Sequence, residues 1–167
     1  MGNNNLVNSL STLAFEGRRR QFAEEQLIAL MKLIERGDID NYAPQGSWAG
    51  GMGHTQFIPQ TWLNYGIDGN NDGIKNPWTP YDALSSTANY LQKSGWKSGE
   101  PVFCEVEIPA NFDYSLLEQE KNIAEWKNLG LNLLDNCPNN MKANLWLPAG
   151  IKGPALLRGK NFSVIKV

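Results

Sequence analysis

The segment GSWAGGMGHTQFIPQTW, residues 46–62, combines features that neither an ordinary loop nor an ordinary helix tolerates. Its four glycines fall within eight residues, and each glycine inside a helix would cost roughly 1 kcal/mol relative to alanine. The same stretch carries large apolar side chains that are unusual in a solvent loop, among them Trp48, Met52 and Phe57. Because glycine allows a close approach to the backbone, this composition predicts an irregular segment that lines a binding groove.

Helical patterns flank this segment on both sides. Apolar residues recur at helical spacing over residues 4–15, and again from Arg20 until Gly37 ends the pattern. After the segment, Pro59 begins a short helix that reaches about residue 65. Thr79 then precedes a longer helix that ends before Gly95. The first part of the chain is therefore predicted to be helical.

The pattern changes near residue 97. Residues 102–108 alternate between apolar and polar side chains, as a half-buried strand does. A short helix is expected over residues 122–129, and short strands over 131–134, 142–147, 154–158 and 162–166. The sequence thus predicts an α+β protein with a helical domain at residues 1–97 and a small β-rich subdomain at 98–160. Residues 161–167 are expected to begin a return to the helical core.

Composition excludes some functions. A formal net charge of −2 gives no electrostatic footprint for nucleic acid, and no stretch reaches the roughly 20 apolar residues of a membrane span. No signal peptide opens the chain, so membrane anchoring is expected only through segments outside it. The three adjacent arginines at residues 18–20 fit either a solvated helix end or an anion clamp. Whether Cys104 and Cys137 pair is left open by two thiols alone.

The loop at residues 68–74, DGNNDGI, matches the first half of a calcium-binding loop. Oxygen donors stand at its first, third and fifth positions, a glycine at the sixth, and a carbonyl is available at the seventh. Thr79 occupies the twelfth position, where a bidentate glutamate is usual, and Asp82 is the acidic residue that reaches back if the loop is longer. The alternative is a metal-free turn with Asp82 capping its own helix. The predicted ligands are Asp68, Asn70, Asp72, the Ile74 carbonyl and Asp82, with Ca²⁺ or Na⁺ as a structural ion and no organic cofactor.

Glycoside chemistry is the remaining candidate for the glycine-rich segment. Ser47 directly follows a glycine and does not form the nucleophile-elbow motif, while His54 is the single histidine, so nucleophilic and zinc catalysis find little support. Saccharide sites use aromatic faces, amide groups and one or two carboxyl groups. Trp48 and Phe57 would supply the faces, and Ser47 and Gln56 the polar contacts. The alternative is that the glycines allow tight packing and the aromatic residues form core.

Residues 46–96 resemble the central region of the lytic murein transglycosylase B family, glycoside hydrolase family 103. The segments that carry the resemblance are GSWAGGMGHTQFIP, with Gly51 where the family motif has Ala, the DGNNDG loop, WTPYDA and ANYLQKSGW. SLSTLAFEGRRRQF, residues 9–22, resembles the helix that precedes them, and the last residues are similar, more weakly, to the family's final β-segment.

This resemblance implies a lysozyme-like, mainly α-helical core with a small inserted antiparallel β-rich subdomain. It also implies cleavage of the β-1,4 bond between N-acetylmuramic acid and N-acetylglucosamine, with formation of 1,6-anhydromuramic ends. One Glu acts first as the acid and then as the base. In the family that Glu lies in an E-(S/T)-x-(F/Y)-G motif just before the matched segment, so this chain is expected to be an internal fragment that lacks its acid.

Residue roles follow from the same resemblance. Ser47 would hold the absent Glu, and Gln56 and Tyr90 would contact the glycan, together with Trp48 and Phe57. Arg19 and Arg20 correspond to an arginine pair near bound peptidoglycan. Among carboxyl groups of this chain, Glu16, Glu24 and Glu25 are more readily explained as surface charges than as a replacement acid.

Three hypotheses remain for the function. The principal one is the core of a peptidoglycan lytic transglycosylase; its rival is a non-catalytic glycan-binding module that keeps the groove. A calcium-responsive interaction domain would depend on the Asp68 loop alone. Peptidoglycan strands are the expected partner, a monomer the expected state, and the periplasm or cell envelope the expected location.

Overall fold

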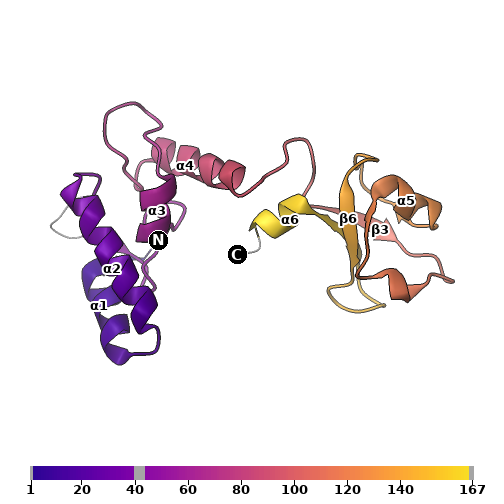
Figure 1. The fold of residues 1–167 in the computed structure, drawn as a ribbon, viewed down its shortest axis with the longest axis horizontal. Helices are drawn as coiled ribbons and strands as arrows, with labels where there is room; N and C mark the ends of the chain where they lie inside the picture. The colour runs from indigo at the N-terminus through magenta and orange to yellow at the C-terminus, as the bar shows by residue number, and fades with distance from the viewer. Residues whose placement is uncertain (1, 40–43, 166–167) are drawn as a thin grey trace. The chain divides into compact units, whose positions relative to one another are not determined.

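The computed structural model describes residues 2–39 and 44–165 of the chain. They form two compact units, Met1–Tyr90 and Leu91–Val167 (Figure 1). The first unit is mainly helical, with a two-stranded sheet, and the second contains a five-stranded antiparallel sheet with short helices. The expected mixture of helices and strands is thus confirmed. The domain boundaries expected at residues 97 and 160 stay a prediction, and residues 166–167 lie outside the described residues.

The helices of the first unit begin and end where sequence signals place them. Asn5 caps the first helix by accepting the N–H of Asn8 at 3.0 Å, and Gly17 ends it with a φ of 77°, a conformation that glycine adopts easily. Pro59 occupies the first turn of the third helix. The elements are β1 (Asn4–Asn5), α1 (Leu6–Glu16), α2 (Arg20–Glu35), β2 (Gln45–Gly46), α3 (Pro59–Tyr65) and α4 (Pro80–Lys93). The four predicted helices are confirmed.

In the core of the first unit, apolar residues of α1, α2 and α3 pack together with Met52 and Phe57 of the glycine-rich segment. Gln26 on α2 is a buried polar exception, since its Oε1 accepts the N–H of Gln60 at 2.9 Å. That N–H lies in the first turn of α3, where backbone donors have no partner within the helix. The buried residues of this core are Leu6, Leu10, Leu30, Leu33, Ile39, Met52, Phe57 and Trp62.

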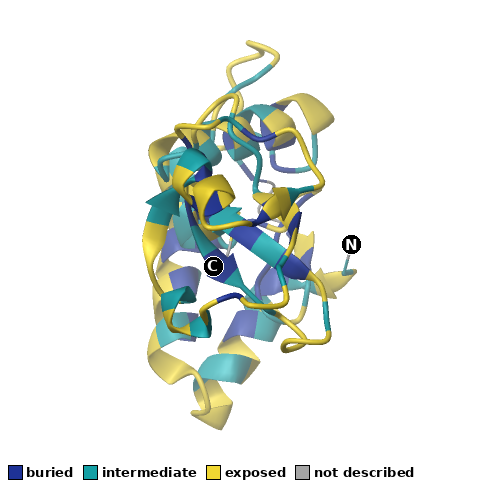
Figure 2. Cartoon of the chain, turned by 90° about the vertical axis from the view of Figure 1, so that its right-hand side faces the viewer, coloured by how far each residue is buried: buried dark blue, intermediate teal, exposed yellow. Residues whose placement is uncertain are grey.

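The second unit contains a five-stranded antiparallel sheet with the order β4-β6-β7-β3-β5. Buried and exposed residues alternate along β3, as the sequence pattern predicted. Figure 2 shows buried and exposed positions interspersed along the helices and strands of the chain. The elements are β3 (Phe103–Glu107), η1 (Tyr114–Leu116), β4 (Glu120–Asn122), α5 (Ile123–Asn128), β5 (Asn132–Leu133), β6 (Lys142–Trp146), β7 (Ala155–Gly159) and α6 (Lys160–Ile165).

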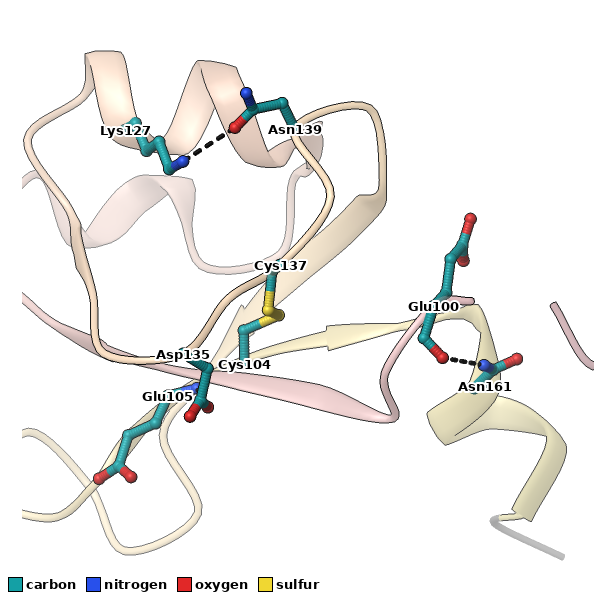
Figure 3. Close-up of a disulfide and its surroundings, with 8 residues drawn as sticks. All are labelled: Glu100, Cys104, Glu105, Lys127, Asp135, Cys137, Asn139 and Asn161. Carbon is teal, nitrogen blue, oxygen red and sulfur yellow. Dashed lines mark hydrogen bonds between the residues drawn. A yellow bond between two sulfur atoms is a disulfide. The ribbon is translucent and has the colours of Figure 1, made fainter. Parts of the chain in front are cut away.

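A disulfide between Cys104 and Cys137 lies in the core of the second unit (Figure 3). It joins β3 to the loop before β6, with Cα atoms 6.4 Å apart. Trp126 of α5 is completely buried in the same core, and its Nε1–H donates to the carbonyl of Ala143 at 2.9 Å. The pairing that the sequence left open is thus formed.

The strand predicted over residues 162–166 is wrong. Residues 160–165 form the helix α6, in which Asn161 and Val164 are buried three positions apart. Phe162 packs against Trp146 with ring centroids 5.2 Å apart. The apolar and β-branched residues read as a strand, but contacts with the sheet and with residues 97–100 favour a helix, as tertiary context often does.

Candidate saccharide-binding groove and calcium-type loop

The glycine-rich segment folds into two successive tight turns. Ser47 closes the first, because its N–H donates to the carbonyl of Gly51 at 2.8 Å and its Oγ accepts the N–H of Gly51 at 2.9 Å. Met52 closes the second by donating its N–H to the carbonyl of Phe57 at 2.8 Å.

The glycines of this segment are in close contact with other parts of the chain. A Cβ on Gly46 would collide with the carbonyl of Gly51 and with Leu6, and one on Gly53 would collide with the carbonyl of Pro77. All four glycines are buried. The expectation that they leave backbone open to a polymer is therefore corrected, since their role is close packing.

Ser47 and Gln56 are brought together across Gly51. An ideal Cβ on Gly51 would lie 3.0 Å from both the Oγ of Ser47 and the Oε1 of Gln56. Gln56 is exposed and has a φ of 54°, which is unusual for a residue other than glycine, and its Nε2 donates to the carbonyl of Gly53 at 2.7 Å. Backbone strain of this kind tends to occur at functional sites.

The aromatic residues divide between surface and core. The side chain of Trp48 is 68% exposed, whereas Phe57 is 9% exposed and packs edge to face on Trp62 and Tyr90. Tyr90 is half-buried between Phe57 and Tyr65. The expectation that Phe57 offers a face to a sugar is corrected, because its ring is part of the core.

A groove of about 750 Å³ runs along α1, and Trp48 and Arg19 are among the residues that line it. Arg19 also stacks over Phe22, with its guanidinium carbon 4.3 Å from the ring centroid. Arg20 does not line the groove and pairs instead with Glu24 at 2.7 Å on the exposed side of α2. The groove therefore brings together only part of the predicted arginine pair.

The polar side of α1 forms a wall of the groove, which was not predicted from the sequence. The groove is also lined by Glu16 and Arg18 and by the amides and hydroxyls of Asn4, Asn5, Asn8, Ser9 and Thr12. Several of these side chains recur three or four residues apart, which places them on one helix face. The spacing of these polar residues could have predicted a polar helix face. The sequence pattern was instead interpreted only through the apolar stripe that includes Leu6 and Leu10.

Within residues 2–39 and 44–165, no Asp or Glu side chain is hydrogen-bonded to Ser47 or Gln56. Glu24 and Glu25 are exposed on α2 and bond to Arg20 and Gln21. Glu16 is exposed at the end of α1.

The calcium-type loop is held by hydrogen bonds within itself. Asp68 accepts the N–H groups of Asp72 at 3.2 Å and Gly73 at 2.8 Å, and Asp72 accepts the N–H of Ile74 at 2.9 Å. The Oδ1 of Asn70 also lies 3.2 Å from the N of Asp72, so the donor oxygens gather around one turn. In the described part of the chain, no group of three or more His, Cys, Asp or Glu side chains is arranged to hold a metal.

Asp82 reaches back from α4 to Gly69, inside this loop, and to Asn76, two residues after it. Its carboxylate is completely buried and accepts the N–H of Gly69 at 2.8 Å and that of Asn76 at 2.7 Å. Burial alone would raise the pKa of Asp82, but the hydrogen bonds that its carboxylate accepts, those from Asn76 and Gly69 being the largest, together outweigh burial and the pKa is lowered. The hydroxyl of Thr79 and the N–H of Asn70 lower the pKa further. The capping role that the sequence left as an alternative is not formed, since the N–H of Thr79 donates to the carbonyl of Asn76.

Comparison with known proteins identifies a family. The family described as "Transglycosylase SLT domain" matches residues 1–167. Membrane-bound lytic murein transglycosylase B of Escherichia coli (strain K12) is 35% identical over 103 residues, which are 61% of this chain and 28% of that protein.

Solved structures agree with this match. SltB3 from Pseudomonas aeruginosa, in complex with NAG-anhNAM-pentapeptide, is 47% identical with a TM-score of 0.91, and the match covers 99% of this chain and 46% of that chain. Slt35 from Escherichia coli, in complex with calcium, is 30% identical with a TM-score of 0.79, covering 99% of this chain and 54% of that chain. The chain thus spans about half the length of these structures, and the expected lysozyme-like α+β fold is confirmed. No helix among the described residues is long and apolar enough to cross a membrane.

Proposed function

Because the chain belongs to the transglycosylase SLT-domain family, we propose that it forms the glycan-binding core of a peptidoglycan lytic transglycosylase of glycoside hydrolase family 103. The observation that carries the proposal is the groove along α1. It combines an exposed indole, Trp48, with the guanidinium of Arg19 and a row of amide and hydroxyl groups. Aromatic faces bind sugar rings, and amides and hydroxyls bind their polar substituents.

The proposed reaction cleaves the β-1,4 bond between N-acetylmuramic acid and N-acetylglucosamine. A Glu outside the residues matched here protonates the leaving oxygen and then takes the proton of the muramic 6-hydroxyl, whose oxygen closes onto the anomeric carbon. No water is consumed, and the product carries a 1,6-anhydro ring. Ser47 would position this Glu, while Gln56 and Tyr90 would contact the sugars beside it.

A second candidate is a non-catalytic peptidoglycan-binding module. It is favoured by the described carboxyl groups, none of which is bonded to Ser47 or Gln56. On this alternative the groove binds glycan strands and the chain carries out no chemistry by itself.

Incubation of the chain with isolated peptidoglycan distinguishes these candidates. Soluble products are analysed by mass spectrometry for 1,6-anhydro muropeptides, and the pellet is analysed for co-sedimented protein. Co-sedimentation without such products is the expected result for this chain, and cleavage should then require the upstream Glu segment. Anhydro products from the chain alone would mean that a resident carboxyl group acts as the acid, and Glu16→Gln would be the first test. Absence of co-sedimentation would contradict both candidates.

We further propose that the loop at residues 68–74 binds a structural Ca²⁺ or Na⁺. Its donors are all oxygens and include the carboxylates of Asp68 and Asp72, which suits a hard cation. Asp82 contributes by holding Gly69, inside the loop, and Asn76, two residues after it. A titration with Ca²⁺ followed by calorimetry and melting should show binding and a higher melting temperature, which Asp68→Asn should abolish.

The proposed location is the periplasm or cell envelope, where peptidoglycan lies. The buried disulfide between Cys104 and Cys137 supports it, because such bonds persist in oxidising compartments.

A further inference from the structure

The loop at residues 68–74 contains two peptide bonds of the same kind, Asp68–Gly69 and Asp72–Gly73. The backbone nitrogen that follows an aspartate can attack the carboxyl group of that aspartate, and glycine hinders the attack least because it has no Cβ. For this attack the nitrogen must leave its hydrogen bond and the peptide must rotate. The packing around each glycine therefore decides how readily its aspartate reacts.

The Asp68–Gly69 bond is held against α4. The N–H of Gly69 donates to the carboxylate of Asp82 at 2.8 Å, and Asp82 is completely buried. A Cβ on Gly69 would lie 2.5 Å from both the Oγ of Ser85 and the carbonyl oxygen of Tyr81, so the peptide has little room to rotate. The nitrogen of Gly69 can attack only when the contact between the loop and α4 opens.

The Asp72–Gly73 bond is exposed instead. A Cβ on Gly73 would meet no atom of the described chain within 4 Å, so this peptide has room to rotate. The N–H of Gly73 donates to the Oδ2 of Asp68 at 2.8 Å, which is an exposed hydrogen bond within the loop. The exposed carboxylate of Asp72 accepts from its near neighbours Asn70 and Ile74. Exposed local hydrogen bonds of this kind open more often than buried ones.

We propose that Asp72 is a site of spontaneous isomerisation to isoaspartate, and that Asp68 in the same loop is protected from this reaction. The nitrogen of Gly73 attacks the Cγ of Asp72 and forms a C–N bond, while the hydroxyl of the carboxyl group and the proton of the N–H leave as water. Water then opens the resulting succinimide. Opening at the α-carbonyl breaks the original peptide bond and leaves the chain joined through Cγ. The water lost in the first step is regained in the second, so the mass is unchanged and nothing is oxidised or reduced.

Isomerisation would change the loop in a defined way. The Cβ of Asp72 becomes part of the main chain, which lengthens by a carbon atom, and the free carboxylate is then attached directly to Cα. The N–H of Ile74 would lose the acceptor that now lies 2.9 Å away, and the structural ion proposed above would lose an oxygen donor. The reaction itself needs neither the ion nor a glycan, so its test is independent of the proposed function.

Ageing of the folded chain tests the proposal. The chain is incubated for several weeks at neutral pH with a chelator present, and trypsin then releases residues 37–75, which contain both bonds. Electron-transfer fragmentation of this peptide measures isoaspartate separately at Asp68 and Asp72. The reference is the same chain in guanidinium chloride, where both bonds are accessible. Asp72→Glu is the control for the assignment, because a glutamate would have to close a larger ring and reacts much more slowly.

Isoaspartate should form about tenfold faster at Asp72 than at Asp68 in the folded chain, because only the latter bond is protected by burial. In the unfolded chain the two positions should react at similar rates. Asp72→Glu should remove the signal at residue 72 and leave that at Asp68 unchanged. Similar rates at both positions in the folded chain would overturn the proposal, as would a folded chain that stays unmodified at Asp72 while the unfolded chain reacts.

Discussion

The carboxylate of Asp82 accepts the backbone N–H of Asn76 at 2.7 Å, and both residues flank the start of α4. The other carboxylate oxygen accepts the N–H of Gly69 at 2.8 Å. One buried side chain thus satisfies a backbone donor inside the calcium-type loop and another just after it.

Replacement of Asp82 by alanine should destabilise the chain strongly. Two backbone donors at a completely buried site would lose their acceptor, at a cost of about 2–4 kcal/mol in the free energy of unfolding. Urea denaturation measures the change, with the exposed Glu25→Ala on α2 as the control, which should be nearly neutral. If Asp82→Ala lowered the free energy of unfolding as little as the control does, the loop would be stable without the two hydrogen bonds to Asp82.

Acid should remove the contribution of this same group. The pKa of Asp82 is lowered in the folded state, so its stabilisation is present above the unfolded pKa of about 3.9 and is lost as pH falls through the folded pKa. Asp113, whose pKa is lowered by hydrogen bonds from Ser115, acts in the same direction from an exposed position. Melting temperatures measured from pH 6 downwards should fall less steeply for Asp82→Asn than for the wild type. Parallel curves for the two proteins would exclude Asp82 as the titrating group.

Loss of the disulfide should destabilise the second unit. Cys104 and Cys137 are 33 residues apart, and the chain-entropy treatment gives about 4 kcal/mol for a loop of that length. The double variant Cys104→Ser/Cys137→Ser should melt at a lower temperature than the wild type. A reducing agent should lower the wild-type melting temperature and leave that of the double variant unchanged. Insensitivity of the oxidised wild type to reduction would contradict the pairing.

Gln56→Ala should weaken glycan binding without unfolding the chain. The side chain is exposed, and loss of a polar contact to a sugar should reduce affinity by up to about tenfold. Co-sedimentation with peptidoglycan measures affinity, and Gln21→Ala, an exposed glutamine on α2, is the control. Unchanged affinity together with an unchanged melting temperature would remove Gln56 from the proposed site.

Trp48→Ala tests the groove along α1 in a different way. Since the indole is 68% exposed, its removal should hardly change stability, but loss of an aromatic contact should weaken glycan binding by about threefold to tenfold. Phe15→Ala is a control, because that ring is 93% exposed on α1, the helix along which the groove runs, and does not line the groove. An equal loss of affinity in both variants would indicate unspecific adhesion to exposed rings.

Much of the fold could be predicted from local patterns. The stripe of Leu6 and Leu10, the prolines at the starts of α3 and α4 and the alternation along β3 all correspond to the observed elements. Each of these signals depends on residues close in sequence, so no knowledge of tertiary contacts was needed. The strand prediction for residues 162–166 was wrong because the helix observed at 160–165 depends on contacts with Trp146 and with the backbone of residues 97–100.

The candidate site was harder to predict for the same reason. Phe57 could be recognised as aromatic but not as buried, since its burial depends on Trp62 and Tyr90. The glycines were correctly recognised as places of close approach, but their neighbours are Leu6 and Pro77 and not a sugar. Asp82 was recognised as able to reach back to the loop, whereas its two backbone partners could be assigned only from the folded structure.

Asn161 also has an architectural consequence. Lys97 and Glu100 precede the first strand of the sheet in the second unit, and Asn161 follows the last one, so three hydrogen bonds tie the entrance of that sheet to its exit. A folded segment whose two ends lie side by side can be added to a loop of another domain, or removed from it, with little disturbance of the flanking helices. The sheet of the second unit therefore has its two ends bonded to each other, which is the connectivity found in segments that tolerate insertion into a loop.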